Sequence, residues 1–203
     1  MKDLQFPFPY REGQREIVSG VYHTVSSKKT LFVQAPTGVG KTMSAIFPSV
    51  RAIGEGKGET LFYLTAKTIT GTVAWEAFHT LRENGLKFKV TAITAKEKLC
   101  FLDSPECTPE KCPYAKGHFD RVNDAVYELW TTEEVYSREV IRAHAEKWQV
   151  CPFEMCLDLS VWVDGVICDY NYAFDPNVHL KRFFGENISG DYIFLIDEAH
   201  NLV

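Results

Sequence analysis

The sequence predicts an α/β fold with a parallel sheet, interrupted by a small helical insert. Short apolar runs alternate with helical patterns, as expected for strands that are buried on both faces of a sheet. A Pro- and Cys-rich stretch breaks this alternation. The acidic excess lies in the same part of the chain: residues 100–156 contain 6 Lys and Arg against 11 Asp and Glu, and the remainder contains 16 of each. We therefore expect a first α/β segment at 1–99, an insert at 100–156 and a second α/β segment at 157–203.

The expected elements follow from the spacing of apolar residues. Strands are predicted at 30–36, 60–66, 87–94, 165–170 and 192–197, where β-branched and aromatic residues gather. Helices are predicted from about residue 42 to 53 and from 68 to 83. In the insert, Thr131 and Glu134 have the spacing of a capping box for a helix that runs to about Trp148. An earlier insert helix presents one apolar face made of Phe119, Val122, Val126, Leu129 and Trp130.

Composition limits the classes of function. The chain is 45% hydrophobic with a formal net charge of −5, so nucleic acid would have to bind through a local patch. The chain has no run of 18 apolar residues and no apolar signal core at its N-terminus, so no membrane span and a cytoplasmic location are expected. In a reducing compartment, the six cysteines are expected to be thiols or metal ligands rather than disulfides.

The stretch APTGVGKT, residues 35–42, has the pattern of a phosphate-binding loop between a strand and a helix. Gly38 and Gly40 allow the backbone to curl so that successive N–H groups point at phosphate oxygens. Lys41 would supply a charge for the β- and γ-phosphates, and the Thr42 hydroxyl would bind Mg²⁺. A glycine-rich turn with an exposed lysine is the alternative. The expected nucleotide ligands are Thr37, Gly38, Val39, Gly40, Lys41 and Thr42.

An acidic pair ends the last apolar run, in the sequence YIFLIDEAH. A carboxylate at the carboxyl end of a parallel strand faces the ligand crevice of such folds. Asp197 is therefore expected to hold Mg²⁺, and Glu198 to orient or deprotonate the attacking water. His200 is expected to couple the γ-phosphate to nucleic acid. The alternative is a strand that ends in solvated acids.

Four cysteines, Cys100, Cys107, Cys112 and Cys151, have the spacing C-x6-C-x4-C-x38-C. Thiolates suit iron–sulfur clusters and Zn²⁺ alike, but structural zinc usually uses paired, tightly spaced cysteines. This pattern favours a 4Fe–4S cluster and leaves zinc or no metal as alternatives. Cys156 is a rival fourth ligand. Cys168 lies in an apolar run and is expected in the core.

The segments FPFPYREGQREIV, TLFYLTAKTITGTVAWEAF, CPFEMCLDLSVWVDGVICDYNYAFDP and DEAHNL resemble, in that order, the XPD/DinG family of superfamily 2 iron–sulfur DNA helicases. Helicases of this kind commonly have Ala at the position of Ala35. The resemblance implies that Gln14 reads adenine, with Tyr10 or Phe8 on the ring. It also implies that Thr65, Lys67 and Thr68 contact the DNA backbone, and it favours Cys151 over Cys156.

The resemblance further implies a RecA-like domain that uses ATP, Mg²⁺ and a 4Fe–4S cluster to unwind single-stranded or forked DNA in the 5′-to-3′ direction, in repair or replication. An arch-like insertion, a second RecA-like domain and motifs III to VI lie beyond these residues in the family, so we expect an incomplete motor that hydrolyses ATP poorly alone. Lys87, Lys89, Lys96 and Lys98 could follow phosphates or form a solvated strand face. The alternative function is an iron–sulfur nucleic-acid-binding or redox module without motor activity.

Overall fold

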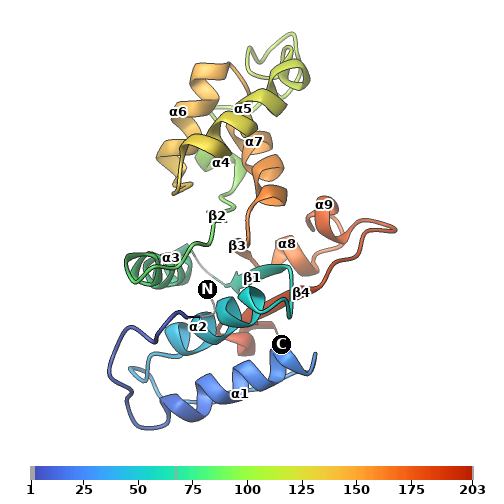
Figure 1. Ribbon diagram of the computed structural model, residues 1–203. Helices are drawn as coiled ribbons and strands as arrows, with labels where there is room; N and C mark the ends of the chain where they lie inside the picture. The colour runs from blue at the N-terminus through green and yellow to red at the C-terminus, as the bar shows by residue number, and fades with distance from the viewer. Residues whose placement is uncertain (1–2, 67, 203) are drawn as a thin grey trace. The chain divides into compact units, whose positions relative to one another are not determined.

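The computed structural model describes residues 3–66 and 68–202, with the side chains of 68–70 left undescribed. The chain divides into two compact units, one of residues 1–88 with 167–203 and one of residues 89–166 (Figure 1). The second unit includes all of the predicted insert, 100–156, and is wider at both ends. The division falls within strand β3 (Gly165–Asp169).

The first unit has the alternating elements that the sequence predicts. Its strands β1 (Thr60–Thr65) and β4 (Tyr192–Ile196) pair in parallel, with Leu61 opposite Ile193. The four strands form one sheet in the order β2-β3-β1-β4, in which β2 is Val90–Ala92. The α/β prediction is therefore confirmed. The helices of this unit are α1 (Gln14–Ser26), α2 (Lys41–Gly54), α3 (Thr68–Glu83), α8 (Asn171–Phe174), α9 (Lys181–Phe184) and the 3-10 turn η2 (Ala199–Leu202).

Strand β1 is the centre of the core of this unit. Residues 61–65 are all buried, which is the pattern of a strand covered on both faces. Phe62 is fully buried, and its ring centroid lies 5.0 Å from that of Phe183 and 5.4 Å from that of Phe194. Helix α1 packs on α2, and α2 packs on β1. The start of α2 is thereby held against the strand that runs through the core.

The predicted strand at 30–36 is wrong: this segment is irregular and exposed in the structure. Phe32 is 89% exposed, and Leu31 and Val33 are more than 40% exposed. A strand forms only where its N–H and C=O groups find a neighbouring strand, and within the described residues none pairs with this segment. The predicted strand at 87–94 is also shorter in the structure, where only Val90–Ala92 is β.

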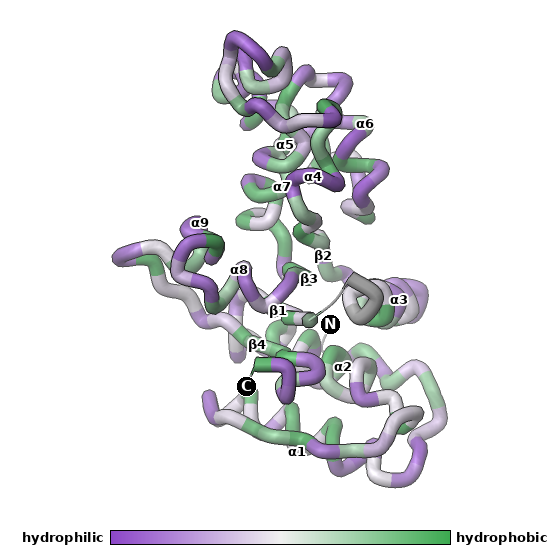
Figure 2. Tube along the Cα trace, turned by 180° about the vertical axis from the view of Figure 1, so that it is seen from behind, coloured by the Kyte–Doolittle hydropathy of each residue, from purple (hydrophilic) through white to green (hydrophobic). Residues whose placement is uncertain are grey.

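The second unit is helical. It contains α4 (Lys96–Leu99), α5 (His118–Thr132), α6 (Arg138–Trp148), α7 (Pro152–Leu159) and the 3-10 turn η1 (Ser160–Trp162). Helix α5 packs on both α6 and α7. Its buried face includes Val122, Val126 and Leu129, as predicted, but Phe119 is 85% exposed. Figure 2 shows hydrophobic and hydrophilic residues alternating along this helix.

The predicted capping box is wrong. Thr131 lies inside α5, where its hydroxyl donates back to the carbonyl oxygen of Tyr127 at 2.8 Å. Helix α6 instead begins after Ser137, whose Oγ accepts from the Val140 N–H at 3.3 Å. Threonine and serine are both common N-cap residues. Because Thr131 already belongs to α5, Ser137 is the residue that caps α6.

Lys89 faces the interior of the second unit rather than a phosphate chain. Its Nζ donates to the carbonyl oxygen of Glu133 at 3.3 Å and to the Tyr136 hydroxyl at 2.8 Å. The ammonium also lies 4.7 Å from the ring centroid of Trp130. This lysine is therefore a structural cation in this structure, and a contact between it and DNA stays a prediction.

In the part of the chain that the structure describes, every helix is too short or too polar to cross a lipid bilayer.

Replacing Phe62 by Ala should lower the free energy of unfolding by about 3–5 kcal/mol, because a fully buried ring leaves a cavity. The exposed Phe32 is the matched control, and its replacement by Ala should change the free energy by about 0.5 kcal/mol or less. Urea unfolding of both variants measures the difference. Equal losses would contradict the placement of β1 in the core.

Candidate functional site

The glycine-rich loop adopts the backbone that phosphate binding needs. Gly38 and Gly40 have φ of 86° and 82°, in the left-handed region that favours glycine. Lys41 is the first residue of α2, and the N-cap residue, Gly40, has no side chain with which to cap that helix. The first N–H groups of α2 are thus available to an anion, and the helix dipole favours negative charge there.

Lys41 folds back over the loop that precedes it. Its Nζ donates to the carbonyl oxygen of Ala35 at 2.9 Å and to that of Pro36 at 3.2 Å. The ammonium that the sequence assigns to the β- and γ-phosphates therefore binds two carbonyl oxygens of the loop in this structure. Neutral carbonyl oxygens bind an ammonium less strongly than phosphate oxygens do.

The segment before α1 is packed against the loop. Gln14 is only 4% exposed, and its Oε1 accepts the Arg11 N–H at 2.8 Å. A Cβ added to Gly40 would lie 2.6 Å from the Gln14 Nε2, so the amide lies directly on the glycine backbone. Arg11 donates to the carbonyl oxygen of Gly38. Gln14 is thus placed beside the loop, and its contact with adenine stays a prediction.

Tyr63 on β1 joins the loop to the acidic strand end. Burial raises the pKa of its hydroxyl, and the side chains of Thr42 and Asp197 lie near enough to act on that pKa as well. The Asp197 N–H also donates to the carbonyl oxygen of Leu64 at 3.0 Å, and the Tyr170 hydroxyl donates to the Asp197 carbonyl. The two expected Mg²⁺ ligands, Thr42 and Asp197, therefore meet at a single phenol.

Glu198 and His200 follow on the surface of the first unit. Glu198 has φ of 50°, and its side chain is 45% exposed. The His200 Nδ1 lies 3.4 Å from the Glu198 Oε2, so the histidine contacts the expected base. The Glu198 carbonyl accepts from the Asn201 N–H at 3.0 Å, which ties the acidic pair to η2.

The expected DNA-contact residues stay predictions. Thr65 is only 2% exposed, and its carbonyl accepts the Tyr170 N–H at 3.1 Å. Lys67 and the side chain of Thr68 lie outside the described residues.

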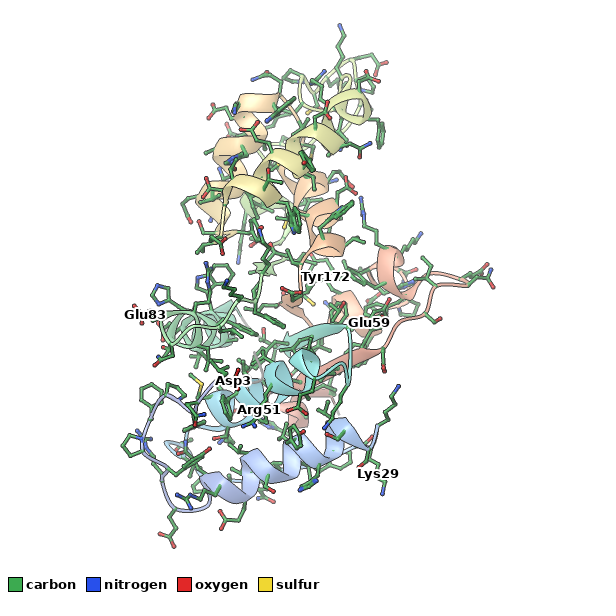
Figure 3. The ribbon with its side chains drawn as sticks, in the orientation of Figure 1. Asp3, Lys29, Arg51, Glu59, Glu83 and Tyr172 are labelled. Atoms are coloured by element: carbon green, nitrogen blue, oxygen red, sulfur yellow. The ribbon has the colours of Figure 1, made fainter. Side chains whose placement is uncertain are left out.

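A surface ion pair marks the far end of α2. Arg51 lies 3.6 Å from Glu55, four residues later on the helix, and Figure 3 labels the arginine. Tyr22 on α1 donates to the same carboxylate, and this bond, together with that from Lys57, lowers the pKa of Glu55. These bonds join α1 to α2 at the end opposite the loop and belong to the scaffold of the site.

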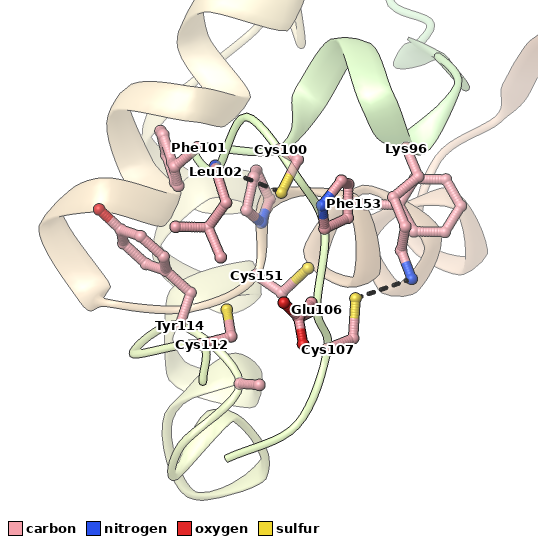
Figure 4. A pocket seen from close by; sticks show the side chains of 13 residues that line it. Lys96, Cys100, Phe101, Leu102, Glu106, Cys107, Cys112, Tyr114, Cys151 and Phe153 are labelled. Atoms are coloured by element: carbon pink, nitrogen blue, oxygen red, sulfur yellow. Dashed lines mark hydrogen bonds between the residues drawn. The ribbon is translucent and has the colours of Figure 1, made fainter. Parts of the chain in front are cut away.

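The second unit brings Cys100, Cys107, Cys112 and Cys151 together around one cavity (Figure 4). The cavity among the lining residues measures ≈ 30 Å³. Cys112 is buried, Cys100 and Cys151 are half-buried, and Cys107 is exposed. Among the described residues, no three His, Cys, Asp or Glu side chains are grouped closely enough to hold a single metal ion. The four cysteines thus line one cavity, but three of their side chains do not converge on the position of a single ion.

The two remaining cysteines lie elsewhere. Cys156 is fully buried, its Sγ is 3.9 Å from the Thr91 Oγ1, and burial raises its pKa to about 11. Cys168 is buried in β3, as predicted for a core residue. Neither residue lines the cavity.

The groups around the cavity suit thiolates. Cys151 precedes α7; burial raises the pKa of its thiol, while the N–H groups of Glu154 and Phe153 act in the opposite direction. The Lys96 Nζ lies 3.4 Å from the Cys107 Sγ, and the Leu102 N–H donates to the Cys100 Sγ at 3.4 Å. Burial lowers the pKa of Lys96, but the bond to Cys107 and nearby negative charge leave it raised. This donor set fits a thiolate-bound iron–sulfur group.

Sequence reasoning missed Arg11, Tyr63 and Lys96 as parts of these sites. Arg11 stands three residues before Gln14, so its place in the same short segment was a signal. Lys96 stands four residues before Cys100, on the turn α4. Tyr63 gave no signal, because its hydroxyl is hidden inside an apolar strand pattern.

Gly40 and Gly38 test the packing of Gln14 on the loop. Replacing either glycine by Ala should cost about 1–2 kcal/mol because of the left-handed backbone. Gly40→Ala should cost more, because only at Gly40 does the new Cβ meet Gln14. In a Gln14→Ala background the extra cost should disappear, with a coupling energy on the order of 1 kcal/mol. Urea unfolding measures it, and additive losses would contradict the contact.

Comparisons with known proteins agree with this geometry. The DEAD_2 family profile matches residues 84–203. A "Probable ATP-dependent helicase" of Methanocaldococcus jannaschii is 40% identical over 201 residues, which cover 98% of this chain and 29% of that protein. The "Regulator of telomere elongation helicase 1 homolog" of Caenorhabditis briggsae is 22% identical over 98% of this chain and 24% of its own length.

A solved structure titled "XPD_Helicase" has the same fold. It superposes with a TM-score of 0.58 at 19% identity and covers 96% of this chain and 33% of its own. The chain thus spans less than a third of the length of these proteins. Since the DEAD_2 profile matches more than half of its residues, this chain belongs to the DEAD_2 family.

Proposed function

We propose that this chain is the ATP-binding part of an ATP-dependent 5′-to-3′ DNA helicase with a 4Fe–4S domain, which acts on single-stranded or forked DNA in repair or replication. One observation carries the nucleotide part of this proposal. Thr42 of the phosphate loop and Asp197 of the DEAH sequence both lie beside the buried Tyr63 hydroxyl, so that both would face one Mg²⁺–triphosphate. The similarity to helicases named above supports the reaction class.

The residues of the first unit would divide the work as follows. The loop N–H groups and the start of α2 bind the phosphates, and Lys41 exchanges two carbonyl oxygens for phosphate oxygens. Thr42 and Asp197 hold Mg²⁺. Glu198 orients the attacking water, and His200, in contact with Glu198, relays the state of the nucleotide toward DNA.

The second unit would bind the 4Fe–4S cluster through Cys100, Cys107, Cys112 and Cys151. When bound, the cluster would supply a rigid cross-link among loops with little regular structure of their own. Lys96 would offset part of the negative charge that four thiolates bring to the cavity.

A module that binds nucleic acid or transfers electrons without motor activity is the second candidate. It is favoured by the fact that all four cysteines lie within one compact unit, apart from the phosphate loop. DNA-stimulated ATP hydrolysis by the complete protein, with and without Lys41→Ala, separates the two functions. Loss of DNA-stimulated hydrolysis in the Lys41→Ala variant supports the motor. Unchanged function of that variant supports the module.

Lys41→Ala should weaken the binding of Mg²⁺–ATP to this chain at least about tenfold, because a charge-assisted bond to phosphate is lost. Lys28 is the matched control, because its ammonium pairs with Asp191 at 2.8 Å on the surface of the same unit. Lys28→Ala should leave affinity unchanged. Titration with a fluorescent ATP analogue provides the measurement, and equal affinities for both variants would argue against the phosphate loop.

Cys151 and Cys156 separate the two possible fourth ligands. Purified without oxygen, Cys151→Ser should lose the visible absorption band and most of its iron. Cys156→Ser should keep about four irons per chain, because Cys156 lies away from the cavity. An iron assay with a visible spectrum decides. Iron loss in Cys156→Ser with retention in Cys151→Ser would reverse the assignment.

A further inference from the structure

We propose that His118 and Arg121, in the first two turns of α5, form a clamp that positions Cys151 relative to Cys112 for metal binding. The clamp consists of these two side chains and the backbone groups that they bind. This inference rests on the proposed cluster, because it assigns the two residues a role toward its ligands. Both residues fall in the 38-residue gap between Cys112 and Cys151, and the spacing of the cysteines assigns no role to residues of that gap.

His118 holds the backbone of Cys151 directly. The imidazole is 3% exposed, and its Nδ1 accepts the Cys151 N–H at 3.2 Å. Since Nδ1 acts as the acceptor, the ring is neutral with its proton on Nε2. The bond spans 33 positions of sequence and ends at the residue that begins α7. It therefore limits the direction in which the Cys151 side chain leaves the backbone.

Arg121 binds the two residues at the end of the preceding helix. Its Nε donates to the carbonyl oxygen of Trp148 at 3.0 Å, and its Nη2 donates to that of Gln149 at 2.6 Å. Gln149 has φ of 53°, and this left-handed residue ends α6. Helix ends leave carbonyl oxygens without intrahelical partners, and the guanidinium satisfies these two. The turn that leads from α6 to Cys151 is thereby bound to α5.

The same arginine reaches the loop that carries Cys112. Its Nη2 also donates to the carbonyl oxygen of Lys116 at 2.9 Å. The Lys116 N–H in turn donates to the Cys112 carbonyl at 3.2 Å, as does the Ala115 N–H at 3.1 Å. The chain then enters α5 through Gly117, with φ of 66°. Two cysteines that are far apart in the sequence are thus linked to adjacent turns of one helix.

Such a clamp has a clear physical effect. A metal group that must gather distant ligands opposes the chain entropy of closing the loop between them. Hydrogen bonds that hold the ligand backbones in place before the metal arrives reduce that cost, as outer partners of metal ligands generally do. We therefore expect the clamp to control how long the iron is retained rather than whether α5 forms.

The test compares His118→Asn with His118→Gln in the full chain. Asn places a carbonyl oxygen at the δ position, where it can still accept the Cys151 N–H, whereas Gln places its oxygen one bond farther out. Both side chains are neutral and polar, and because Gln is the better helix former, faster iron release in the Gln variant would not come from a weaker helix. His118→Gln should release iron to a chelator at least about tenfold faster than the wild type. His118→Asn should retain the wild-type rate.

Arg121→Met provides a second variant and should also speed iron release. His144 supplies the control, because its Nδ1 lies 3.2 Å from the Val140 carbonyl within α6, so His144→Gln should change nothing. Amide hydrogen exchange at Cys151 in the iron-free chain measures the bond between the Cys151 N–H and His118 without metal. Exchange should be faster in His118→Gln than in the wild type, and unchanged in His118→Asn and His144→Gln. Iron-bearing protein with equal release rates in the Asn and Gln variants would overturn the clamp. Wild-type protein that takes up no iron would overturn the cluster itself.

Discussion

The position of the buried Tyr63 hydroxyl, beside both the start of α2 and the end of β4, is the constraint on which the nucleotide site depends. The phenol lies in a strand whose neighbours are all apolar, and burial keeps it protonated. The two side chains that act on this hydroxyl are Thr42, at the start of α2, and Asp197, at the end of β4. The packing of α2 on β1 and the parallel pairing of β1 with β4 bring those partners within reach. The aromatic core around Phe62 stabilises this arrangement from the other face of the strand.

Much of the fold follows from the order of apolar runs. The helix after the phosphate loop, both parallel strands and the helical insert could be expected, because each is marked by periodicity or by a glycine signal. The strand expected at 30–36 could not be judged in this way. Leu31, Phe32 and Val33 are strand-forming residue types, but residue type does not reveal whether a neighbouring strand is available to pair with them. Thr131 shows that helix caps are limited in the same way. A threonine near a helix end can cap the next helix or, as here, lie inside the helix and donate to its backbone.

The candidate sites divide in a similar manner. Residues with a motif of their own, such as Lys41, Asp197 and the four cysteines, could be assigned from the sequence to a loop, a strand end and an insert. The residues around them have no motif: Tyr63 lies beside Thr42 and Asp197, and His118 accepts the Cys151 N–H. Long-range contacts of this kind depend on packing, which spacing along the chain does not encode. Packing likewise distinguishes the two candidate fourth ligands: Cys151 lines the cavity, whereas Cys156 is fully buried elsewhere.

The exposed run at Leu31–Val33 bears on how the isolated chain behaves in solution. Strand β4 also leaves Phe194 and Ile196 more than a third exposed, so two β-forming apolar segments of the first unit are open to water. Unprotected segments of this type pair readily with copies of themselves on other molecules. We therefore expect concentrated samples to self-associate through these segments, and we expect a charged substitution at Phe32 to improve their solubility.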